Sequence, residues 1–115
     1  MFSDKECYLL KKIIEKINHV ESVSQHYALS IINALEDSIL GRAALLIHLK
    51  AITEEFENST FDILKAYDKE DIKRLRRVRN YIAHQYDNVD NEIIFDIIST
   101  RLPIIKKTSL PLLDG

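Results

Sequence analysis

The chain has 115 residues, a length that suits one domain with a single core. It contains only 2 glycines and 2 prolines but 46% hydrophobic residues, which excludes collagen and disorder and favours packed helices over a turn-rich β-sandwich. With 16 basic and 18 acidic residues, the formal net charge of -2 argues against polyanion binding by the whole surface.

The cysteine and hydropathy patterns favour a reducing compartment, with the cytoplasm as the simplest location. Cys7 is the single cysteine, so no internal disulfide or multi-thiolate zinc site can form. His19, His26 and His48 lack the spacing of a zinc motif, and no glycine-rich phosphate loop occurs. No uncharged run approaches the ~20 residues that cross a bilayer, and no signal peptide is seen. We therefore expect no metal, cofactor or membrane span.

The first half of the chain has helical periodicity. Ser3 and Glu6 have capping-box spacing before a run of apolar residues, which predicts a helix from about Asp4 to the low twenties. Two further helices are expected over about 27–35 and 40–56, with a break at 36–38; one bent helix is the less favoured alternative. Gly41 would lie inside the third helix, where it costs about 1 kcal/mol relative to alanine.

The second half predicts two more capped helices. Asp68 follows a short apolar segment and is a good N-cap for a helix to about Gln85. After a turn at 87–88, Asp90 caps the last helix, which Pro103 must kink or loosen because proline has no amide donor. The tail 111–115 is expected to fray. The sequence therefore predicts one all-α domain, an up-and-down bundle of four to five helices.

The helix that follows Asp68 departs from simple amphipathicity. At ~100° per residue, one stripe faces the core. This stripe consists of Ile72, Leu75, Val78, Ile82 and Tyr86. Arg79 falls within it, where an unpaired guanidinium is costly and needs a carboxylate, a phosphate or a water-filled cleft. A polar stripe on the flank consists of Lys73, Arg77, Asn80 and His84.

Each of these features also has an ordinary explanation. Arg79 could pair with a buried glutamate, His84 could complement the helix dipole, and Tyr86 could be a core tyrosine. The same helix carries five cations within seven residues, which could be a solvated face or a patch that holds phosphates. These cations are Lys73, Arg74, Arg76, Arg77 and Arg79. The coincidence of all these features near residues 79–86 points to a functional site.

Residues 79–86 match an R-x4-H-x-Y signature and thereby resemble the HepT-like toxins of the HEPN superfamily of prokaryotic helical ribonucleases. The similarity extends through 89–98 to Leu102-Pro103 and upstream to 49–56, where Glu54 occupies the family's glutamate position. Phe95 stands where the family often has tryptophan, Thr53 replaces a glycine, and the usual Pro-Trp before the basic helix is absent. The similarity covers about residues 43–107 and, less securely, the first helix.

The resemblance implies metal-independent endoribonuclease activity. RNA supplies its own 2'-hydroxyl nucleophile, so the protein must provide proton transfer and charge stabilisation. Histidine has an unperturbed pKa of about 6.5, and the arginine fork can bind two phosphate oxygens. We assign His84 as general acid/base, Arg79 as phosphate clamp and Asn80 as an orienting residue, with Glu54 supporting Arg79. The residues expected to attract RNA phosphates are Lys73, Arg74, Arg76 and Arg77.

Arg79 and His84 lie about 140° apart on an unbroken helix. Either the helix loosens near His84, or the site is shared across a two-fold axis, as the homodimers typical of HEPN proteins imply. The resemblance also implies a minimal nucleotidyltransferase antitoxin that transfers AMP to the motif tyrosine, here Tyr86. Two other functions stay open: a non-catalytic helical module that presents nucleic acid or substrate to that nucleotidyltransferase, and a purely structural bundle.

Overall fold

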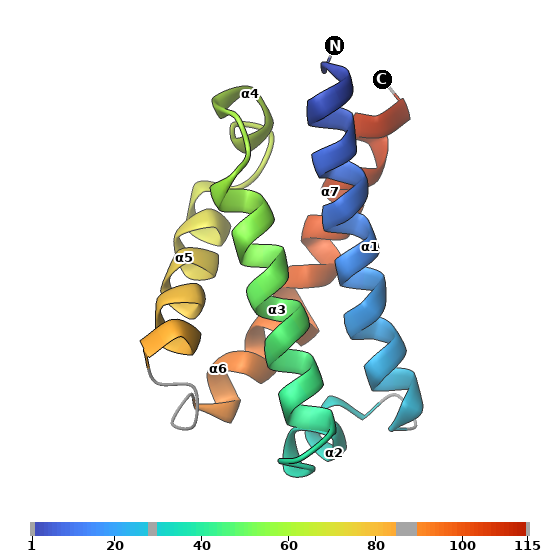
Figure 1. Ribbon diagram of the computed structural model, residues 1–115, viewed down its shortest axis with the longest axis vertical. Coiled ribbons are helices and arrows are strands. Elements are labelled where there is room, and N and C mark those ends of the chain that lie inside the picture. The colour runs from blue at the N-terminus through green and yellow to red at the C-terminus, as the bar shows by residue number, and fades with distance from the viewer. Residues whose placement is uncertain (1, 28–29, 85–89, 115) are drawn as a thin grey trace.

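The computed structural model describes residues 2–27, 30–84 and 90–114, and within these ranges it contains helices and turns but no strand. The helices are α1 (Asp4–His26), α2 (Ile31–Glu36), α3 (Gly41–Glu57), α4 (Phe61–Leu64), α5 (Lys69–His84), α6 (Asn91–Asp96), the π-helical segment Ile97–Arg101 and α7 (Leu102–Asp114). Figure 1 shows α1, α3, α5 and the α6–α7 rod alternating in direction. The predicted all-α, up-and-down bundle is confirmed.

Side-chain caps set the helix starts that the sequence predicts. The Ser3 hydroxyl accepts a hydrogen bond from the Glu6 amide at 3.1 Å, and the Glu6 carboxylate accepts one from the Ser3 amide at 3.0 Å. Asp68 and Asp90 each accept a hydrogen bond from the amide two residues later, both at 2.8 Å. These bonds satisfy amides that the first helical turn leaves without partners.

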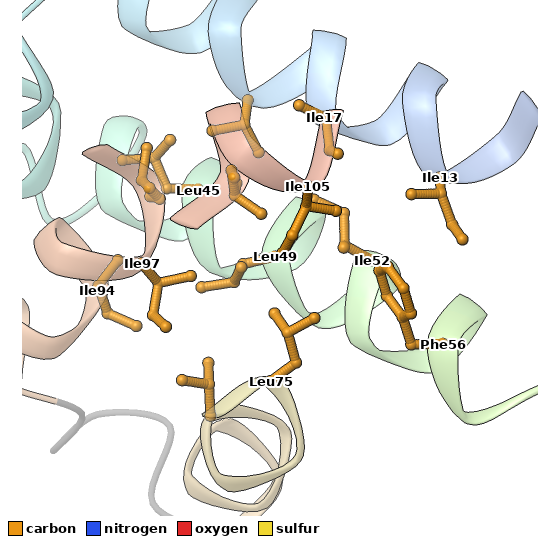
Figure 2. Packing of buried hydrophobic residues seen from close by; sticks show 14 of the residues in the cluster. Ile13, Ile17, Leu45, Leu49, Ile52, Phe56, Leu75, Ile94, Ile97 and Ile105 are labelled. Carbon is orange, nitrogen blue, oxygen red and sulfur yellow. The ribbon is translucent and has the colours of Figure 1, made fainter. Parts of the chain in front are cut away.

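The core lies between α3 and the helices around it. α3 packs against α1, α2 and α5, and α1 also packs against α7. Figure 2 shows apolar side chains of α1, α3, α5, α6 and α7 meeting in one cluster. Fully buried members are Leu10, Ile13, Ile17, Leu45, Leu49, Ile52, Leu75, Ile94, Leu102 and Ile105. This interior fixes the position of α5 and leaves its outer face available for chemistry.

The break at 36–38 separates two helices, so the single bent helix is excluded. Asp37 holds the turn, because its carboxylate accepts hydrogen bonds from the Tyr27 hydroxyl at 2.5 Å and the Leu40 amide at 3.1 Å. Gly41 lies in α3, as expected, but as its first residue rather than in its interior. A Cβ at Gly41 would lie 2.3 Å from the Ala34 carbonyl oxygen. Close approach of two backbones explains this glycine.

The continuous helical run from α6 to α7 becomes irregular before Pro103, as expected. Residues Ile97–Arg101 form a π-helical segment directly before α7. The Ser99 hydroxyl donates to the Phe95 carbonyl at 2.6 Å, so a side chain satisfies a carbonyl at the irregular turn. Pro103 is the second residue of α7 and follows this segment directly, so the chain stays helical through the proline.

The expectation of a frayed tail was wrong, because α7 continues to Asp114 with Pro111 inside it. The hydroxyls of Ser109 and Tyr67 form a buried hydrogen bond of 2.6 Å, and residues 112–113 pack partly buried against the core. These contacts fix the tail in a helical conformation. The turn expected at 87–88 lies outside the described residues.

Candidate functional site

The two predicted faces of α5 are both present. Its inward stripe is buried and consists of Ile72, Leu75, Val78 and Ile82. The flanking polar stripe is exposed along its whole length and consists of Lys73, Arg77, Asn80 and His84. Arg79 is half-buried at the border of the apolar stripe. The polar stripe is therefore anchored by the core beneath it but open to a ligand. Tyr86, the remaining predicted site residue, lies outside the described residues.

Arg79 has no carboxylate partner in the part of the chain that the structure describes. Its side chain forms no ion pair or hydrogen bond there, so the ordinary explanation of a buried glutamate pair is not realised. Asn80 and His84 are exposed, and their side chains also have no hydrogen-bonding partner within the described ranges. A half-buried guanidinium without a counter-ion in the described ranges keeps its hydrogen-bond donors available to an anion such as a phosphate.

The helix does not bring Arg79 and His84 together. α5 is α-helical through His84, so the loosening considered as one way to converge the two side chains is absent. Five residues of regular helix separate the directions of the two side chains by about 140°. Within one chain, Arg79 and His84 therefore point at different regions of space.

Glu54 does not lie against Arg79. Its carboxylate pairs instead with Lys50, one turn earlier on α3, with 3.7 Å between Lys50 Nζ and Glu54 Oε1. Both side chains are about half exposed, so this is a surface pair with a small contribution to stability. The expected contact between Glu54 and Arg79 was therefore wrong. Lys50 lies one turn away on the same helix and is the nearer cation.

The five cations of α5 do not form one compact patch, since their directions spread over about 220° of the helix circumference, largely on the side away from the buried stripe. Two of them are paired: Lys73 with Glu70 at 3.6 Å, and Arg76 with Glu57 of α3 at 3.1 Å. The Arg74 and Arg77 guanidiniums have no ion pair within the described ranges and line a cleft between α5 and α6.

This α5–α6 cleft has a volume of about 350 Å³. Its lining residues on α5 are Arg74, Arg77, Val78 and Tyr81, and those from the last rod are Asp90, Glu92, Ile93, Asp96 and Ile97. The cleft thus joins a basic and aromatic wall to an acidic one over an apolar floor. No ion pair bridges the two walls, all of whose residues are described.

One part-buried ion pair that sequence analysis missed links the helices that form the two walls. Asp71 is 2% exposed and accepts a 2.5 Å hydrogen bond from Arg101 Nε. The Asp71 carboxylate raises the pKa of Arg101 above its usual value. This pair ties α5 to the π-helical segment that follows α6. The signal was available, because Asp71 falls between Leu75 and Val78 on the helical wheel and cannot face solvent.

Among the described residues, no group of three His, Cys, Asp or Glu side chains is arranged to hold a metal ion. No helix there is long and apolar enough to cross a membrane. His19 and His48 contact each other at 5.1 Å between ring centroids on the α1–α3 surface, and burial together with His19 lowers the pKa of His48.

Comparison with known proteins gives one result. The family model described as "Ribonuclease HepT-like" matches residues 5–111. The match spans from the first turn of α1 into the last turn of α7, and so includes the first helix, where the resemblance seen in the sequence was less secure. No curated protein and no solved structure matches the chain at a significant level.

Proposed function

Because the chain belongs to the HepT-like ribonuclease family, we propose that it is a metal-independent endoribonuclease and the toxin of a toxin–antitoxin pair. The observation that supports this most is the state of the R-x4-H pair on α5. Arg79 is half-buried without a counter-ion in the described ranges, and His84 is exposed. A phosphate would neutralise the guanidinium, and an exposed imidazole is accessible to RNA.

In the proposed reaction, the RNA 2'-hydroxyl attacks the adjacent phosphorus and the bond to the 5'-oxygen of the next nucleotide breaks. His84 either takes the proton of the 2'-hydroxyl or gives one to the departing 5'-oxygen, and solvent water makes the other of these two transfers. Arg79 binds two oxygens of the phosphate as negative charge builds up on them. Asn80 orients the phosphate or the imidazole. The products are a 2',3'-cyclic phosphate and a free 5'-hydroxyl.

We further propose that two copies of the chain share each site. A regular α5 directs Arg79 and His84 about 140° apart, so one copy does not easily supply both to the same phosphate. A two-fold axis beside this helix can place Arg79 of one copy opposite His84 of the other, because an isologous interface pairs different residues reciprocally.

The proposed antitoxin is a minimal nucleotidyltransferase that adds AMP to Tyr86. This residue follows His84 by two positions, so an added group would stand near the proposed catalytic histidine. The phosphate of AMP also carries negative charge that would compete with RNA for the cations of α5. Both effects would silence cleavage.

The experiment that tests the activity is incubation of purified protein with RNA in a metal chelator. We expect cleavage with 2',3'-cyclic phosphate ends, which end-group analysis by mass spectrometry identifies. Products with 3'-hydroxyl ends, or activity only after a divalent ion is restored, would contradict the mechanism. Binding of RNA without any cleavage would favour the alternative function, a helical module that presents nucleic acid or substrate to a nucleotidyltransferase.

A further inference from the structure

The α5–α6 cleft opens on the face of α5 that carries His84. Arg77, Tyr81 and His84 follow one another at steps of four and three residues, so they form one stripe along the helix. At 1.5 Å per residue, Tyr81 lies about 4.5 Å from His84 along the helix axis. A strand of RNA held at His84 therefore has the cleft next to it.

The cleft provides a surface on which a flat base can stack. Tyr81 is 43% exposed at its wall, whereas Val78, Ile93 and Ile97 line it with aliphatic groups. Unpaired RNA bases stack on aromatic side chains of this kind. A volume of about 350 Å³ lies at the lower end of the range for ligand sites, which suits one nucleotide rather than a duplex.

The acidic wall has one carboxylate that is free to contact a ligand. Asp90 Oδ1 already caps α6 at 2.8 Å, and Asp96 Oδ1 accepts a 3.0 Å hydrogen bond from Thr100. Glu92 is exposed at the cleft, and its carboxylate has no partner within the described ranges. It can therefore accept two hydrogen bonds from a ligand.

The chemistry of a free carboxylate distinguishes between bases. Guanine presents two adjacent donors, N1–H and the N2 amino group, which match the two oxygens of a carboxylate. Uracil presents one N–H donor between two carbonyl oxygens, which a carboxylate repels. The phosphate of the same nucleotide can reach Arg74 or Arg77 on the opposite wall, where both guanidiniums lack an ion pair among the described residues.

We propose that the α5–α6 cleft is a subsite for one unpaired guanosine nucleotide of the RNA substrate, stacked on Tyr81 and bound through its base edge by Glu92. The choice of RNA as the source of the nucleotide rests on the proposed function. The subsite sets which nucleotide lies beside the phosphate that is cut, so it determines where the enzyme cleaves.

The test measures binding rather than cleavage. Isotope-labelled protein is titrated by NMR with GMP, with UMP and with 2'-O-methyl pentanucleotides UUGUU and UUUUU, which lack the 2'-hydroxyl nucleophile. We expect GMP to shift the amide signals of Tyr81 and Ile93 and to bind about tenfold more tightly than UMP, the scale of a bidentate base contact. UUGUU should bind more tightly than GMP because its further phosphates reach the cations of α5.

Three variants connect the binding to the cleft. Tyr81→Ala should weaken GMP binding about tenfold while Tyr81→Phe retains it, the expected effect of losing one stacking partner. Glu92→Gln should bring the affinities for GMP and UMP close together. Glu15→Gln, an exposed carboxylate on α1, is the matched control and should change neither. All three substituted side chains are exposed, and circular dichroism checks that each variant keeps its helices.

Equal affinities for GMP and UMP, signal shifts confined to other surfaces, or unchanged binding by Tyr81→Ala would overturn the subsite. Tighter binding of GMP than of UUGUU would overturn RNA as its ligand and indicate a free nucleotide. If the protein binds guanosine but cleaves no RNA, the proposed ribonuclease activity is overturned and the guanosine subsite still holds. Cleavage that depends on His84, without guanosine binding, would overturn the subsite alone.

Discussion

Arg79 and His84 leave the same regular helix about 140° apart, one half-buried beside the core and the other exposed. Neither side chain has a hydrogen-bonding or charged partner in the described ranges. One copy of the chain thus has both chemical groups of the proposed site but directs them at different regions. The mechanism therefore depends on how many copies of the chain form one active site.

The first prediction is a homodimer whose sites are shared. Arg79→Ala and His84→Ala should each be inactive, but an equal mixture should regain about a quarter of wild-type activity, because half of the dimers are mixed and each of these has one intact site. RNA cleavage before and after mixing measures the recovery. Sedimentation equilibrium should show a dimer at micromolar concentration.

The mixing experiment needs proof that subunits exchange, which native mass spectrometry of differently labelled chains provides. Exchanged but inactive mixtures would show that each site is built within one copy. A species of only 13.4 kDa at micromolar concentration would contradict the dimer directly.

The second prediction concerns Tyr86. Co-expression with the cognate nucleotidyltransferase should add one or more AMP units to this tyrosine and abolish cleavage, because the added phosphate brings negative charge close to the cations of α5. Intact-mass and peptide mass spectrometry locate the modification. Tyr86→Phe should stay active in the presence of the antitoxin, whereas the control Tyr81→Phe, at a tyrosine of α5, should still be neutralised. AMP found only on another residue would refute the role of Tyr86.

The helices could be predicted because their signals are local. The Ser3, Asp68 and Asp90 caps and the inward stripe of α5 depend on residues within one or two turns of each other, and all are present. The helical tail was missed because the bond between Tyr67 and Ser109 joins positions 42 residues apart. The cost of Pro111 was visible in the sequence, but the tertiary contacts that offset it were not.

Gly41 gives a third prediction, on stability. Replacement of a helical glycine by alanine normally stabilises, but a Cβ here would meet the Ala34 carbonyl oxygen at 2.3 Å and Tyr27 Cζ at 2.9 Å. Gly41→Ala should therefore lower the free energy of unfolding, by about 1–3 kcal/mol for an overpacked site. Urea denaturation followed by circular dichroism measures the change. The exposed control Lys11→Ala should stay within about 0.5 kcal/mol of wild type, and a stabilised Gly41→Ala would contradict the contact.

The fourth prediction is a loss of stability in acid. The Tyr27 hydroxyl and the Leu40 amide lower the pKa of Asp37, and the Thr60 hydroxyl and the Ser3 amide lower the pKa of Glu6. A folded pKa below the unfolded value gives stabilisation that is complete above the unfolded pKa of about 4. It disappears as pH falls through the lowered folded value.

Urea denaturation at pH 7 and at steps down to pH 2 should show this decline. The double variant Asp37→Asn with Glu6→Gln should start less stable at pH 7 and lose less on acidification, because it no longer has these carboxylates to protonate. An equally steep decline in the double variant would assign the acid sensitivity to other groups.

The candidate site was only partly predictable from the sequence. Arg79 at the border of the core and His84 on the exposed stripe follow from helical periodicity alone. The position of the cleft does not follow from helical periodicity, because it depends on which face of α6 lies opposite α5. The partners of the basic run also depend on packing: Arg76 meets Glu57 of α3, whereas Arg77 faces the acidic wall of the cleft.

The central claim is that Arg79 and His84 carry out RNA cleavage. Its most direct test is the initial rate of RNA cleavage in a chelator by wild type, Arg79→Ala and His84→Ala, beside the exposed controls Lys107→Ala and His19→Ala. We expect both site variants to fall at least about 100-fold, the contribution of a positioned acid or base, with unchanged helical content and full activity in the controls. Wild-type rates in well-folded Arg79→Ala and His84→Ala would contradict the account.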